Sequence, residues 1–96
     1  MMTQQDVFKE VSKVEHPAIS YSLVKLGIIA DVKLIDNRAV VDFAFPFPNI
    51  PIADALINSV SNHLQNMGLE FEYSVRIMTD EERNKFLKLE AEAWKG

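Results

Sequence analysis

The sequence contains no cysteine among its 96 residues. This absence excludes disulfide bonds, thiol nucleophiles, thiolate zinc sites and ordinary iron–sulfur ligation by the chain itself. Glycine and proline are also scarce, with three and four residues, which leaves no room for a flexible linker or a low-complexity tract. We therefore expect a single domain over residues 1–96 that buries one modest core and works without thiol chemistry of its own.

Positive charge is in short supply as well. Ten Lys and Arg residues face fourteen Asp and Glu residues, for a net charge of -4, and this balance argues against a nucleic-acid binder. No apolar run approaches the roughly 18 residues that cross a bilayer, and the first residues lack the basic-then-apolar pattern of a signal peptide. These features predict a cytoplasmic protein.

Hydrophobic spacing and capping signals predict the helices. The capping-box spacing of Thr3 and Asp6 opens a first helix that Pro17 ends, and Gly27 marks a turn in the extended connection that follows. Apolar residues at helical intervals predict a helix over 51–67, stopped by Gly68. A second capping box, Thr79 to Glu82, opens a terminal helix with a thin apolar stripe.

Alternating apolar residues predict the strands. Residues 30–36 and 39–45 flank Asn37-Arg38 as an antiparallel hairpin, and residues 69–77 alternate throughout, which assigns Tyr73 to the core face. A right-handed crossover then makes the second and third strands parallel. The predicted fold is α/β (α+β), with the order αββαβα, a three-stranded mixed sheet and helices on one face.

No motif for catalysis, nucleotide binding or zinc binding occurs in the chain. His63 has surface-like neighbours, His16 is placed to satisfy carbonyls at the end of the first helix, and the acidic residues 80–82 suit a helix N-terminus. A metal or catalytic role for the two histidines is the less favoured alternative. We therefore expect a non-enzyme with no catalytic, metal-binding or cofactor-binding residue.

The stretch FAFPFPNIPIAD, residues 43–54, joins the second predicted strand to the next helix. Proline disfavours helical geometry at the residue before it and suits the first helical position. Pro51 therefore predicts Ile50 as the N-cap, a position usually taken by a polar side chain that serves the free N–H groups. An apolar residue at such a position is the kind of local inconsistency expected at a functional site.

Four motifs follow one another along the chain: VEHPAI, LVKLGII, PNIPIAD and MTDEER. In this order they resemble motifs of the PaaD-like family of iron–sulfur cluster assembly domains, which has relatives at the N-terminus of Mrp-type cluster-carrier ATPases. The resemblance covers residues 5–87. VEHPAI matches the family's Val-x-Asp-Pro-Glu-Ile, LVKLGII its Val-Asp-Leu-Gly-Leu-Val, PNIPIAD its Gly-Cys-Pro turn, and MTDEER its Met-Ser-x-Glu-x-Arg ending.

The chain departs from the family at informative positions. His16 and Ala18 replace the acidic residues around the first proline, and Lys25 replaces an aspartate. The family cysteine maps onto Ile50, and the Pro-Trp pair that often follows the last strand is missing. A cysteine at a helix N-cap has a lowered pKa and suits thiolate chemistry. Isoleucine cannot perform that chemistry.

The resemblance implies a non-enzymatic accessory or adaptor protein in iron–sulfur cluster assembly or iron–sulfur protein maturation. Its partners would be a scaffold, a carrier ATPase or a client protein. The alternative is a general protein-interaction or homodimerisation module that has kept the fold and left cluster biology. The residues expected to contact a partner are His16, Pro17, Phe47, Asn49, Ile50, Pro51 and Trp94.

Overall fold

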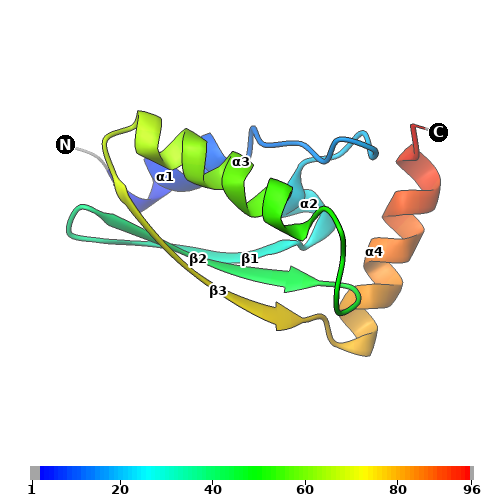
Figure 1. The fold of residues 1–96 in the computed structure, drawn as a ribbon. Helices are drawn as coiled ribbons and strands as arrows, with labels where there is room; N and C mark the ends of the chain where they lie inside the picture. The colour runs from blue at the N-terminus through cyan, green and yellow to red at the C-terminus, as the bar shows by residue number, and fades with distance from the viewer. Residues whose placement is uncertain (1–2, 96) are drawn as a thin grey trace.

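A computed structural model describes residues 3–95 of the chain. Helices and strands follow in the order α1 (Gln4–Val11), α2 (Leu23–Leu26), β1 (Ile29–Ile35), β2 (Arg38–Phe45), α3 (Ala53–Asn66), β3 (Glu70–Ile77) and α4 (Asp80–Ala93). The strands form one sheet in the order β1-β2-β3. Figure 1 shows α1 and α3 lying over one face of this sheet, with α4 at the end where β2 and β3 finish.

The predicted mixed sheet is confirmed. β1 and β2 pair antiparallel, and β2 and β3 pair parallel from Arg38 opposite Glu70 to Phe45 opposite Ile77. The hairpin turn is Asp36-Asn37 rather than Asn37-Arg38, because Asp36 takes a positive φ of 55° and Arg38 already belongs to β2. Asp tolerates this left-handed conformation better than most residues.

The helix signals are confirmed at both capping boxes and at Gly68. The Thr3 and Thr79 side chains each accept a hydrogen bond from the backbone N–H three residues later, and Gly68 has a φ of 82°. The sequence predicts an extended connection before β1, but part of this connection is helical. The Ser22 side chain accepts from the Lys25 N–H and caps the short helix α2, which ends at Gly27 in left-handed geometry.

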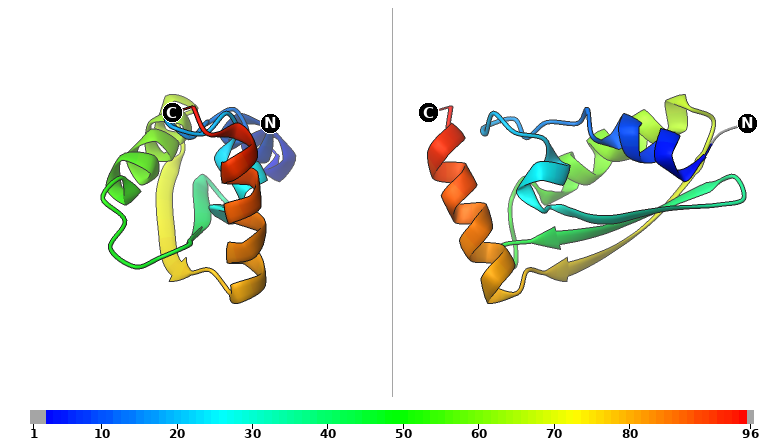
Figure 2. Two further views of the ribbon diagram at one scale, coloured as in Figure 1. Left: turned by 90° about the vertical axis from the view of Figure 1, so that its right-hand side faces the viewer. Right: turned by 180° about the vertical axis from the view of Figure 1, so that it is seen from behind.

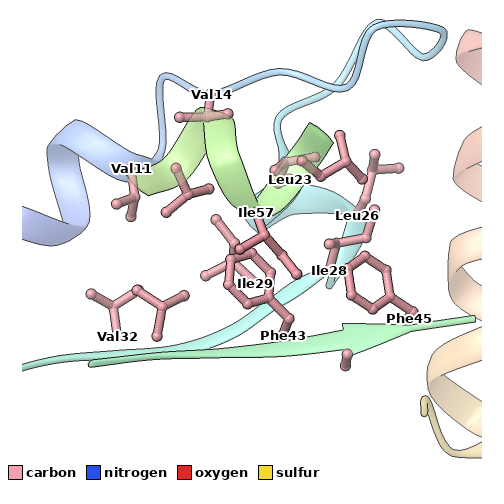
Figure 3. Close-up of a cluster of buried hydrophobic side chains, with 14 of the residues drawn as sticks. Val11, Val14, Leu23, Leu26, Ile28, Ile29, Val32, Phe43, Phe45 and Ile57 are labelled. Atoms are coloured by element: carbon pink, nitrogen blue, oxygen red, sulfur yellow. The ribbon is translucent and has the colours of Figure 1, made fainter. Parts of the chain in front are cut away.

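The core lies between the sheet and its covering helices. Val41, Phe43 and Phe45 of β2 point to the same face and are buried, as the alternation predicts. Figure 3 shows Phe43 and Phe45 packed with Ile57 of α3 and with residues from α1, α2 and β1. Because β2 is central and α3 crosses above it, this core fixes the position of the turn that joins the two.

The prediction that Tyr73 belongs to the core is wrong. Tyr73, Val75 and Ile77 lie on the helix-covered face, as their alternation indicates, but these residues are 49%, 50% and 43% exposed. β3 is an edge strand, so these side chains are covered from one side only. An alternating pattern identifies a common face but cannot show how far the helices extend over it.

Candidate functional site

Residues 46–52 form the turn between β2 and α3, and the structure corrects the prediction made for it. The helix N-cap is Ile52, with φ -91° and ψ 4°, and no side chain caps the helix. The Ala53 N–H donates to the Ile50 carbonyl at 3.1 Å. Ile50 to Ala53 is therefore a turn with Pro51 at its second position, which proline favours. Ile50 lies one turn before the helix and is half-buried against the core.

The side of this turn that faces α4 encloses a hollow of about 350 Å³. We call it the apolar hollow. Its lining comes from the 16–18 connection, the residue before β1, the end of β2, the turn, the start of α3, and α4 with the residue after it: His16, Ala18, Ile28, Phe45, Pro46, Phe47, Ile50, Ile52, Leu56, Phe86, Glu90 and Trp94. Figure 2 shows that α4 and the start of α3 stand on either side of this end of the sheet.

The structure brings His16, Phe47, Ile50 and Trp94 together around this hollow. Pro17 and Pro51 are exposed and are not part of the lining. Asn49 lies at the tip of the turn with a φ of 59° and borders a different hollow, toward β3. Asn is one of the few residues that adopt this left-handed geometry readily, so Asn49 shapes the turn.

His16 is 7% exposed and does not cap helix α1 as the sequence suggested. Its Nδ1 accepts a hydrogen bond from the Ala18 N–H at 3.0 Å. Burial, and secondarily the charge of Lys95, lowers the pKa of His16, so the ring is neutral at pH 7 and its proton lies on Nε2. Among the hydrogen bonds of residues 3–95, none involves Nε2, so this N–H is a free donor on a residue that lines the apolar hollow.

Trp94 is held in place by backbone contacts. The Ser20 N–H donates to the Ala93 carbonyl and the Lys95 N–H to the Ala18 carbonyl, each at 3.0 Å. Ile19 and Trp94 consequently form an antiparallel bridge. Trp94 as a whole residue is 55% exposed although its backbone is fixed. The end of α4 is therefore docked on the 18–20 segment, and Trp94 offers a half-exposed ring at the rim of the apolar hollow.

Arg83 fastens the turn to α4, and the sequence analysis did not single it out. Its Nε donates to the Pro46 carbonyl at 2.7 Å and its Nη2 to the Met78 carbonyl at 3.3 Å. Its guanidinium also lies 5.7 Å from the centroid of the Phe47 ring, a favourable cation–π distance. The sequence did contain a feature that could have pointed to Arg83, because this residue is the last one of the MTDEER motif.

The other polar residues considered in the sequence have structural partners. Nδ1 of His63 lies 3.3 Å from a Glu10 carboxylate oxygen and connects α3 to α1. Asp80 and Glu82 pair with Arg83 and Arg76 at the start of α4. Within the described part of the chain, no three His, Asp or Glu side chains are grouped so that they could hold a metal ion. Across residues 3–95, no helix is long and apolar enough to cross a membrane.

The structure is similar to the crystal structure of a domain of unknown function, DUF59, from Bacillus anthracis. The TM-score is 0.71, with 22% sequence identity over 90% of each chain. The chain has the DUF59 fold. DUF59 is the PaaD-like fold, so the fold that the motifs implied is confirmed, and at this identity the likeness establishes the fold alone. No protein-family model matches the sequence, and no curated protein matches it significantly.

Proposed function

We propose that the protein is a non-enzymatic accessory or adaptor in iron–sulfur cluster assembly or iron–sulfur protein maturation, and that it works in the cytoplasm. The observation that carries this proposal is the apolar hollow. Ile50, at the position matching the family cysteine, lines the hollow together with His16 and Trp94. The resemblance in four spaced motifs and the DUF59 fold support the link to cluster biology.

The chemistry of the apolar hollow suits protein contact. Its lining is largely aliphatic and aromatic, with Glu90 and the His16 N–H as the polar groups. Apolar clefts with a few placed polar groups are typical binding sites, and Trp is a frequent anchor of protein interfaces. A partner would insert an apolar side chain against Ile50 and offer a carbonyl or carboxylate to His16 Nε2. The iron–sulfur cluster would be cargo held by that partner.

The test is Ile50→Asp, compared with Ile35→Asp as a matched control. Ile35 is 49% exposed at the hairpin end of β1, away from the hollow. Tagged wild-type protein should recover a cluster scaffold, a carrier ATPase or cluster-containing clients from its native cell. Ile50→Asp should recover at least about tenfold less, because a buried carboxylate opposes an apolar partner, whereas Ile35→Asp should match the wild type.

Two outcomes oppose the proposal. Recovery of no cluster-related protein by the wild type would remove the link to cluster biology. Equal recovery by Ile50→Asp, with its folding verified by circular dichroism, would show that the turn connects β2 to α3 but does not bind the partner. The first outcome shifts the assignment to the second candidate, whereas the second keeps the cluster role and moves the partner contact away from Ile50.

The second candidate is a homodimerisation module. Phe47 and Trp94 favour it, since both residues line the apolar hollow and are 48% and 55% exposed. Light scattering across a concentration series would show a dimer, and Trp94 fluorescence would shift to shorter wavelength as the ring leaves water. A monomer with unchanged fluorescence at about millimolar concentration would dismiss this candidate.

A further inference from the structure

β3 has a free edge because it pairs with β2 on one side only. At the ends of the β2–β3 ladder, the Glu70 N–H donates to the Asn37 carbonyl at 2.9 Å and the Met78 N–H to the Phe45 carbonyl at 2.7 Å. Backbone groups in a strand alternate in direction, so the even-numbered residues bond to β2. The N–H and C=O groups of the odd-numbered residues therefore point away from the sheet: Phe71, Tyr73, Val75 and Ile77.

The other edge of the sheet is protected against further pairing. β1 has a register shift between Ile29 and Asp31, and the Leu34 N–H donates to the Gln4 side chain of α1 at 3.4 Å. Bulges, charged residues and covering helices are the usual ways to block an edge strand. β3 pairs with β2 over its eight residues without a register shift. Its charged residues, Glu70, Glu72 and Arg76, lie on the uncovered face of the sheet. The side chain of Arg76 also donates to the outward carbonyl of Ile77 at 3.4 Å, whereas the outward groups of Phe71, Tyr73 and Val75 have no side-chain partner among residues 3–95. It is the edge open to a further strand.

A groove runs along this open edge beneath α3. Val75 and Ile77 of β3, together with Ile57 of α3, line a hollow of about 320 Å³ that the turn closes at one end. The lining is Phe45, Phe47, Pro48, Asn49, Ile50, Ala53, Asp54, Ile57, Val75 and Ile77. We call this hollow, with the edge of β3 leading into it, the edge groove. Figure 1 shows β3 running below α3 toward the turn.

An added strand would lie about 4.8 Å from β3, beside the groove that Val75, Ile77 and Ile57 line. The alternative occupant is a second copy of the domain, paired β3 to β3. A second copy would bring the same net charge of -4 to this edge, and like charges facing each other disfavour association. An extended segment of opposite charge is therefore the favoured occupant.

The charges beside β3 indicate which side chains the bound segment carries. On the uncovered face of β2 and β3, the cations are already paired, Arg38 with Glu72 at 3.2 Å and Arg76 with Glu82 at 2.7 Å. Glu70 on the same face has no ion-pair partner among residues 3–95, and Asp54 adds an acid at the groove. The free charge along this edge is negative, so basic side chains are favoured next to it.

We propose that β3 binds an extended segment of a partner protein, in which apolar residues alternate with Lys or Arg, as an additional strand of the sheet. The apolar residues enter the edge groove, the basic ones face Glu70, and the backbone pairs with the odd-numbered residues of β3. This surface is additional to the apolar hollow and does not depend on a role in cluster biology.

The test uses a synthetic capped peptide of alternating Val and Lys, added to the isotope-labelled protein. Amide exchange of Tyr73 and Val75, whose N–H groups point outward, should slow at least about tenfold at saturation. The same peptide with Glu in place of Lys should bind about tenfold more weakly at low salt, and the difference should shrink at high salt. Absence of protection at millimolar peptide would overturn the proposal.

The alternation of backbone groups provides a sharp control. Val75→Pro removes an outward N–H and keeps the β2–β3 bonds, so it should abolish peptide binding in a folded protein. Ser74→Pro removes a β2-facing N–H and should instead destabilise the fold. If Val75→Pro does not fold, Val75→Lys should repel the basic peptide and weaken binding at least about tenfold. Unchanged binding to either folded Val75 variant, or protection that appears without peptide as protein concentration rises, would refute the proposal.

Discussion

The apolar hollow and the edge groove share the 46–52 turn but differ in how they are assembled. The apolar hollow draws on segments from His16 to Trp94, nearly the whole chain. The edge groove uses β3 and α3, which the crossover places together, and the tip of the turn. The first surface therefore depends on how α4 and the 16–18 connection dock, whereas the second depends on the sheet and its covering helix.

The two surfaces also differ in the chemical groups that they present to a partner. The apolar hollow presents side chains and one N–H donor from His16, with few free backbone groups, so it would recognise the shape of a side chain. The edge groove presents a row of free backbone groups beside apolar side chains, so it would recognise an extended backbone. Under the two proposals, one small domain would contact two partners in different ways.

The largest effect that separates the two surfaces is expected for Phe86→Ala. Phe86 is 4% exposed and is the buried residue of α4 that lines the apolar hollow. Truncating it should cost about 3–5 kcal/mol in the free energy of unfolding, and Phe86→Leu should cost much less. Urea unfolding measures the loss. Amide exchange should be measured at urea concentrations below the unfolding transition. If exchange becomes as much faster in β3 as in α4, the two surfaces do not depend on separate parts of the fold.

Arg83→Lys should have an intermediate effect. Lysine keeps the positive charge but lacks the separate guanidinium nitrogens that donate to the Pro46 and Met78 carbonyls. The expected cost is about 1.5–3 kcal/mol, with faster amide exchange in the turn. Arg38→Lys is the control, because its exposed pair with Glu72 should contribute only about 0–1 kcal/mol. Equal, small costs for the two variants would show that Arg83 does not hold the turn.

The smallest effect is a pH dependence at the junction of β3 and α4. Arg76 donates to both Glu82 oxygens, at 2.7 and 2.9 Å, and with the Thr79 N–H it lowers the pKa of Glu82 to about 2. Since the folded pKa lies below the unfolded value of 4.5, this contribution is complete above about pH 4.5 and is lost as pH falls toward 2. It stabilises the fold at neutral pH.

Urea midpoints measured from pH 7 to pH 2 test this dependence. Glu82→Gln should flatten the curve below pH 4.5, and Glu81→Gln, at the neighbouring exposed position, should not. Identical curves for wild type and Glu82→Gln would exclude the Arg76–Glu82 pair as a source of pH dependence.

Much of the fold could be predicted because its signals are local. The Thr3 and Thr79 capping boxes, Gly68 and the alternation of residues 69–77 each involve neighbours in the sequence, and the structure confirms the elements that they define. The helix α2 was missed because it has only four residues, about one turn, so its apolar residues cannot recur over the several turns that reveal a helical period. The helix start after Ile50 was misplaced because Pro51 suits the second position of a turn as well as a helix.

The candidate site was predicted only in part. His16, Phe47, Ile50 and Trp94 were chosen as separate residues, and the structure shows that they line one hollow. Arg83 and Phe86 were not chosen, since nothing nearby in the sequence indicates that one reaches the Pro46 carbonyl and the other closes the hollow. Such contacts join residues tens of positions apart and follow from packing.

The sequence alone determined the elements, their order, the mixed sheet and the absence of thiol chemistry, because periodicity, capping and composition are properties of the chain itself. The tertiary structure decided what surrounds each residue. It placed Ile50 half-buried before the helix and left Tyr73 half-exposed at a free edge. It also fixed Trp94 beside the 18–20 segment. Burial depends on which distant segment packs against a side chain, and that is settled only when the whole core forms.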